Sequence, residues 1–365
     1  MDQIEHKYVE VNGIKLHVAE IGKESSPAVV FLHGFPEIWY TWRHQMIGVA
    51  NAGFRAIAPD FRGYGLSDHG VEPDKTSFSD MLYDTVAILD FLNISKVFVI
   101  GKDFGAFVAY AFALLYRERV LGVVTLGVPF IPPGPLVSHE TLPEGFYISR
   151  FRDPGRAEAD FSRFDAKTVV KNIYILFSGS EIPIASKNQE IMDLVESDTP
   201  LPSWFTEDDL TAYGNLYEKS GFRTSLKVPY RSLLDERYEF KIEDPKVEGR
   251  ALLIMGEKDY LFKFPGVEDV INGAEMKKYV PNLEVIYVPD GSHFVQEQFP
   301  DEVNKLILVQ TPKYKHHKSP IHLDNKSMKK YGREANWAIV YALWAIVEVN
   351  QIYYGRQCQL EVEAH

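Results

Sequence analysis

The stretch that decides the fold is KVFVIGKDFGA, residues 96–106. It begins with a short run of β-branched and aromatic residues, which is the pattern of a buried strand. It then passes through Gly101 and Gly105, which flank Asp103, into a helix-like stretch that continues to Tyr116. Glycine is needed at such a turn because the backbone and the following helix come too close for side chains. The spacing therefore predicts a sharp strand-to-helix turn with Asp103 at its tip.

Strand-like and helix-like stretches alternate on both sides of this turn. We expect strands at 14–18, 28–32, 55–59, 96–100, 120–126, 251–255 and 283–288, and helices at 41–52, 79–92 and 303–308. This alternation is typical of an α/β protein with a mostly parallel sheet.

A proline-rich segment, Ile131–Pro135, interrupts the alternation, because neither helix nor strand tolerates that density of proline. The chain from there to about Pro245 has helix starts, such as Thr206 before an acidic first turn, and no clear strands. We therefore predict a first core part (1–130), a helical cap (131–245), a second core part (246–311) and an atypical C-terminal tail (312–365).

Composition and charge exclude several classes of protein. The chain has 365 residues, of which 45% are hydrophobic and 25% charged, as expected for a globular protein. Its net charge of −12 makes nucleic acid an unfavourable partner. Cys358 is the single cysteine, and the polar start lacks the pattern of a secretory signal. We therefore expect a cytoplasmic protein, a monomer or homodimer, without a membrane span.

Asp103 has two interpretations. An aspartate before a helix is most often an N-cap residue. It could also be a nucleophile, because the helix N-terminus favours its ionised form. Asp259 follows the strand at 251–255 and His293 follows the strand at 283–288. Nucleophile, acid and histidine in that order, each just past a strand, is the triad order of the α/β-hydrolase fold. Glu257 competes with Asp259 for the role of the acid.

A further motif, His33–Glu37, follows the strand at 28–32. It could be only a tight turn. Its position also suits an oxyanion hole, in which the backbone N–H groups of Phe35 and Phe104 would stabilise a developing negative charge.

Taken together, these residues resemble the epoxide hydrolases of the α/β-hydrolase superfamily, specifically the plant-type soluble enzymes. The resemblance covers about Val9 to Leu308 and includes a cap inserted after the sixth strand. Within the cap, 146–155 and 221–231 look like the segments that carry the family's two epoxide-binding tyrosines, which are Tyr147 and Tyr230 here. Phe104 departs from the tryptophan that many relatives carry after the nucleophile.

The resemblance implies a mechanism without a cofactor or metal. Asp103 would form a covalent ester with an apolar epoxide, such as one from a fatty acid, and Tyr147 and Tyr230 would bind the ring oxygen. His293, oriented by Asp259, would then activate the water that releases a vicinal diol. The expected substrate contacts are Phe35, Trp39, Phe104, Tyr147 and Tyr230.

Two other functions remain open. A haloalkane or haloacid dehalogenase shares the aspartate nucleophile, but it favours indole donors for the halide, whereas two phenols suit an epoxide oxygen. A non-catalytic receptor for a small apolar ligand would also use this fold, although it would not require all three triad residues.

The tail 312–365 carries eight Lys and Arg against five Asp and Glu. We interpret this segment as the product of an altered transcript or gene model, and His316–His317 within it as a solvated loop.

Overall fold

The computed structural model describes residues 3–131, 143–232, 242 and 244–309 of the chain. Its centre is an eight-stranded sheet with the strand order β1-β2-β4-β3-β5-β6-β7-β8. The strands are β1 (Glu5–Val11), β2 (Ile14–Ile21), β3 (Ala28–Leu32), β4 (Arg55–Pro59), β5 (Val97–Lys102), β6 (Val120–Leu126), β7 (Ala251–Gly256) and β8 (Leu283–Val288). Strands β3 to β8 pair in parallel, so the mostly parallel sheet predicted from the sequence is confirmed.

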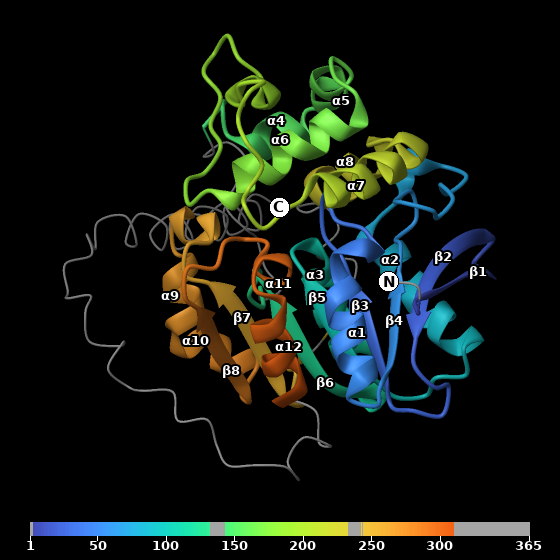
Figure 1. Ribbon diagram of the computed structural model, residues 1–365. Helices are drawn as coiled ribbons and strands as arrows, with labels where there is room; N and C mark the ends of the chain where they lie inside the picture. Colours follow the sequence, from blue (N-terminus) through green and yellow to red (C-terminus); the bar gives the residue numbers. More distant parts are fainter. Residues whose placement is uncertain (1–2, 132–142, 233–241, 243, 310–365) are drawn as a thin grey trace, which may run out of the picture.

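Helices cover both faces of this sheet (Figure 1). The core helices and turns are η1 (Trp39–Trp42), α1 (Arg43–Asn51), η2 (Pro73–Lys75), α2 (Phe78–Phe91), α3 (Phe104–Leu115), η3 (Arg117–Arg119), η7 (Tyr260–Lys263), α9 (Val267–Asn272), α10 (Ala274–Tyr279), α11 (Val295–Gln298) and α12 (Pro300–Val309). Helix α1 packs against α12 on one face, and α2 packs against α3 on the other. Because both faces are covered, β3, β4 and β5 are buried along their whole length.

Strand β1 is an element that the sequence analysis missed. It lies at the edge of the sheet, pairs antiparallel with β2, and leaves most of its side chains exposed or half-buried. An edge strand of this kind needs no continuous apolar run, so hydrophobic pattern alone does not reveal it. The turn that joins it to β2 contains Asn12 and Gly13, both with positive φ. An Asn-Gly pair is a strong hairpin signal and could have located the strand.

The helical segment between β6 and β7 forms a separate layer above the sheet in Figure 1. It consists of α4 (Tyr147–Arg152), α5 (Arg156–Phe161), α6 (Ala166–Ser178), η5 (Ile191–Leu194), α7 (Glu207–Ser220), α8 (Arg223–Leu226) and η6 (Lys227–Arg231). This is the place in the chain where the cap is predicted, after the sixth strand. The proposed boundaries near 130 and 245 adjoin undescribed residues and stay predictions. The tail 312–365 lies outside the described residues.

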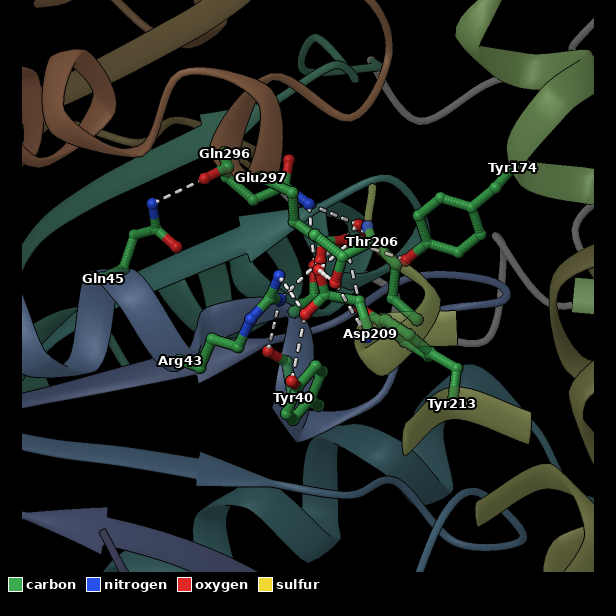
Figure 2. Close-up of polar contacts among 11 residues, drawn as sticks. Tyr40, Arg43, Gln45, Tyr174, Thr206, Asp209, Tyr213, Gln296 and Glu297 are labelled. Carbon is green, nitrogen blue, oxygen red and sulfur yellow. Dashed lines mark hydrogen bonds and ion pairs between the residues drawn. The ribbon is translucent and has the colours of Figure 1, made fainter. Parts of the chain in front are cut away.

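A buried charged cluster joins this cap to the core (Figure 2). Arg43, at the start of α1, bonds Glu297 of α11 through Nη1 at 2.5 Å and Asp209 of α7 through Nη2 at 2.9 Å. The hydroxyls of Tyr174 in α6 and Tyr213 in α7 donate to Glu297 Oε1 at 2.8 and 3.1 Å. One guanidinium thus compensates two carboxylates from different layers, and it fixes the cap over the carboxyl-terminal part of the core.

No helix within the described ranges is both long enough and apolar enough to cross a bilayer.

The buried cluster predicts a large loss of stability when its cation is removed. Arg43→Met would leave Glu297 and Asp209 as uncompensated buried charges, and it should lower the free energy of unfolding by about 3–5 kcal/mol. Urea denaturation at neutral pH would measure this change. The control is Arg223→Met, which removes an exposed ion pair with Asp74 across the same cap–core boundary. Equal stability of the two variants would contradict the assignment.

Candidate active site

The site is built around the sharp turn between β5 and α3. Asp103 stands at this turn with φ 51° and ψ −124°, a strained conformation for a residue with a side chain. A Cβ atom on Gly105 would lie 2.2 Å from the carbonyl oxygen of Leu32, and one on Gly101 would lie 2.4 Å from that of Gly105. The two glycines therefore let α3 approach the end of β3. This approach places Asp103 beside the loop that follows β3.

The three residues of the predicted triad meet here. His293 Nε2 lies 3.3 Å from Asp103 Oδ2, and His293 Nδ1 lies 2.9 Å from Asp259 Oδ2 and 3.0 Å from Asp259 Oδ1. The three side chains are buried. Glu257, the competing acid, is exposed to solvent, so the structure selects Asp259 as the partner of the histidine.

The charges of this group balance one another. Burial opposes ionisation of Asp103, but the hydrogen bond from His293, the charge of Lys102 and the Phe35 N–H together lower the pKa of its carboxyl group. Burial likewise opposes protonation of His293, yet the charge of Asp259 raises its pKa above the usual value. Asp103 is therefore an ionised carboxylate, and Asp259 stabilises a positive charge on the imidazole.

The loop after β3 supplies the first expected oxyanion donor. The N–H of Phe35 donates to Asp103 Oδ1 at 3.0 Å. Phe104 is the first residue of α3, so its N–H belongs to a helical turn whose donors are not used within the helix. The two oxygens of Asp103 are thus held differently, since Oδ1 accepts the backbone N–H whereas Oδ2 faces the histidine.

Glu37 supports this loop and was missed by the sequence analysis. Its Oε2 accepts the N–H of Gly34 at 3.1 Å, and its Oε1 accepts from Gln296 Nε2 at 2.6 Å. Burial, with smaller contributions from the charges of Asp103 and Glu297, raises the pKa of Glu37 to about 7, although Lys102 opposes this shift. A glutamate within the His33–Glu37 motif was a visible signal, but its burial could not be read from the motif.

The two cap tyrosines contact each other, and one of them contacts Phe104, the residue after Asp103. Tyr147 begins α4, and Tyr230 belongs to the π-helical turn η6. Their rings lie edge to face with centroids 6.2 Å apart, and the ring of Tyr230 also contacts those of Phe35 and Phe104 at 5.6 and 5.4 Å. Burial, as the largest cause, raises the pKa of both tyrosines, and the charge of Asp103 adds to the increase. Both phenols are therefore kept protonated.

Tyr260 is another group that sequence reasoning missed. Its hydroxyl lies 3.1 Å from that of Tyr147, and its ring packs against His293 at 5.0 Å between centroids. It directly follows Asp259 in the sequence, so the core contributes a third phenol beside the two from the cap. Nothing in the local pattern distinguishes it from the other tyrosines.

Trp39, which is expected to contact substrate, packs beside the first two strands, and its contact with substrate stays a prediction. Its backbone N–H donates to Asp60 Oδ1 at 2.8 Å. Its ring packs edge-on against His6, His17 and Tyr40. The anchored backbone directs the indole toward β1 and β2, away from the other expected contacts.

Comparisons with known proteins agree with this geometry. The family model described as alpha/beta hydrolase fold matches residues 27–300. Epoxide hydrolase 2 of Siraitia grosvenorii is 38% identical over 314 residues, which cover 84% of this chain and 98% of that protein. The chain belongs to the epoxide hydrolases of the α/β-hydrolase family.

Solved structures of epoxide hydrolases have the same fold. Potato (Solanum tuberosum) epoxide hydrolase I is 35% identical, with a TM-score of 0.76 over 84% of this chain and 98% of that one. An epoxide hydrolase of Vigna radiata is 34% identical, with the same TM-score and coverage. The family match at 27–300 contains the triad and both cap tyrosines.

The contact between Asp259 and His293 predicts a change in the imidazole pKa. Asp259→Asn removes the charge that raises this pKa, so the pKa of His293 should fall. NMR titration of protein with labelled histidine would measure it, with His293→Gln used to assign the resonance. The control is Glu257→Gln, which neutralises an exposed carboxylate on the same loop and should leave the pKa of His293 unchanged. An unchanged pKa in Asp259→Asn would contradict the pairing.

Proposed function

We propose that this epoxide hydrolase opens apolar epoxides to vicinal diols through a covalent ester on Asp103. The observation that carries the proposal is the different environment of the two Asp103 oxygens. Oδ1 accepts the Phe35 N–H, and Oδ2 faces His293, which is itself held by Asp259. This arrangement supports a division of roles, in which one oxygen attacks the substrate and the other accepts from the oxyanion donor.

In the first step, Asp103 Oδ2 attacks a ring carbon of the epoxide. A C–O bond forms to the carboxylate, the ring C–O bond breaks, and its electron pair stays on the ring oxygen. The resulting alkoxide is much more basic than a phenolate, so Tyr147 and Tyr230 can donate hydrogen bonds and a proton to it. Their burial keeps both hydroxyls protonated until this charge develops.

In the second step, His293 Nε2 takes a proton from water, and the water oxygen attacks Cγ of the ester. Negative charge develops on Oδ1, where the Phe35 N–H already donates and the Phe104 N–H adds a second donor. The tetrahedral intermediate collapses, the C–O bond to the substrate breaks, and the departing oxygen recovers the proton from His293. The diol leaves, the proton that remains on the Asp103 carboxyl group returns to the tyrosine phenolate, and Asp103 is again a carboxylate that now contains one oxygen from solvent.

The phenols favour this reaction over dehalogenation. A halide leaves as a weakly basic anion and needs no proton, whereas the ring oxygen of an epoxide does. Tyr147 and Tyr230 would supply the acidic hydroxyls that this oxygen needs. We further infer a substrate such as a fatty-acid or aryl epoxide, a cytoplasmic location, and a monomer or homodimer.

A single turnover in water enriched in the heavy oxygen isotope should label the protein. With enzyme in excess over a styrene-type epoxide, one heavy oxygen should enter Asp103 while the diol stays unlabelled. Digestion after Lys102 releases a peptide that begins with Asp103, and mass spectrometry would locate the label. Direct appearance of the label in the first diol, with an unlabelled peptide, would exclude the ester.

Removal of the base should trap the ester. His293→Gln should still be alkylated but should hydrolyse the ester at least about 10³-fold more slowly, because general base assistance is lost. Intact-protein mass spectrometry should then show the mass of one added substrate. Asp103→Ala is the matched control and should show no adduct. A folded His293→Gln variant that never accumulates an adduct would argue against this sequence of steps.

A further inference from the structure

A buried lysine lies directly beside the triad, and the proposed mechanism has not yet used it. Lys102 is the last residue of β5, precedes Asp103 and is completely buried. Its Nζ has no hydrogen-bond partner within the described residues. A buried ammonium group without a hydrogen-bond partner is unfavourable, because it loses the hydrogen bonds that water would make to it. The energetic cost of this placement calls for a function.

The lysine side chain ends next to the imidazole of the triad. A Cβ atom built on Gly127 would lie 3.2 Å from Lys102 Nζ, 3.1 Å from His293 Cε1 and 3.3 Å from His293 Nδ1. The ammonium group of Lys102 and the imidazole of His293 therefore both lie next to Gly127, which follows β6. Nζ also lies 5.6 Å from the ring centre of Phe294, a distance at which a cation–π contact offsets part of the lost hydration.

The charged groups that face Lys102 come from three elements. They are Asp103 at the start of α3, Glu37 in the loop after β3, and His293 before α11, with Asp259 behind the histidine. Lys102 forms no ion pair with these carboxylates within the described part of the chain. No single contact neutralises the charge of Lys102, which therefore acts on Asp103, Glu37 and His293 together. Charges interact more strongly in a poorly solvated interior than in water, so a buried charge acts on its neighbours without direct contact.

We propose that Lys102 is a positioning residue whose fixed charge keeps Asp103 ionised and His293 neutral, so that both chemical steps extend to lower pH. This inference rests on the proposed function. Lys102 would not touch the substrate, and it would act only through the two residues that react.

The direction of each effect follows from the sign of the charge. A cation near a carboxylate lowers the pKa of that carboxylate, which here favours the nucleophilic form of Asp103. The same cation lowers the pKa of His293 and opposes the increase caused by Asp259. After Asp103 becomes an ester its negative charge is gone, whereas the charge of Lys102 remains. The effect of Lys102 in lowering the pKa of His293 is thus strongest in the ester intermediate, when the imidazole must be neutral to accept a proton from water.

The test replaces the lysine by a neutral side chain of similar length. In Lys102→Met the pKa values of Asp103 and His293 should both rise, so the acidic limb of the pH–rate profile should move to higher pH by about one unit. At a pH where both proteins lie on their acidic limbs, the rate of Lys102→Met should be roughly tenfold lower than that of wild type. The readouts are diol formation under steady-state conditions and, in single turnovers, the separate rates of ester formation and ester hydrolysis.

Controls separate electrostatics from packing. Lys258→Met neutralises an exposed lysine on the loop that carries Asp259, where it pairs with Asp290, and should leave the profile in place. The thermal midpoint of Lys102→Met should not fall, because the variant removes an unpaired buried charge. Lys102→Gln, measured in parallel, should shift the acidic limb in the same direction.

The outcomes distinguish this inference from the proposed function. If the wild-type protein forms no diol from fatty-acid or styrene-type epoxides, the proposed function fails and the inference fails with it. If wild type is active but a folded Lys102→Met has an unmoved acidic limb, the inference alone is wrong. Failure of both neutral variants to fold would also overturn it, since Lys102 would then be a packing residue.

Discussion

The close approach of backbone at the turn between β5 and α3 is the constraint on which the rest of the site depends. Gly105 lies so near the carbonyl oxygen of Leu32 that any side chain would collide with it. This contact places the start of α3 against the loop after β3, and it explains why Asp103 accepts the Phe35 N–H despite their separation in sequence. The strained φ of Asp103 is maintained because the surrounding strands and helix determine the position of both ends of the turn.

The site and the cap–core cluster are connected through one buried carboxylate. Glu37 accepts the N–H of Gly34 in the loop after β3 and also binds Gln296 of α11. The hydroxyl of Thr41 lies within hydrogen-bond distance of both Glu37 and Glu297, and Arg43 forms an ion pair with Glu297. The loop that carries the proposed oxyanion donor is thus held by the same network that joins the cap to the core.

The two layers contribute different chemistry to the proposed reaction. The core supplies the charged groups, Asp103, Asp259 and His293, on loops at the ends of parallel strands. The cap supplies neutral hydroxyls, from Tyr147 and Tyr230, whose burial keeps them protonated. A charged nucleophile below and neutral donors above the reacting bond match the charge that moves from carboxylate to ring oxygen when an epoxide opens.

The sequence alone determined the alternation of strands and helices, the turn around Asp103 and the positions of the candidate acid and histidine just past two strands, because these depend on local pattern and on the rule that parallel strands end at one edge of a sheet. Only the tertiary structure decided which of Glu257 and Asp259 contacts the histidine, where the indole of Trp39 lies, and that Arg43 joins cap to core. Burial and pairing between residues far apart in the chain settle these points, and neither property is encoded in a local motif.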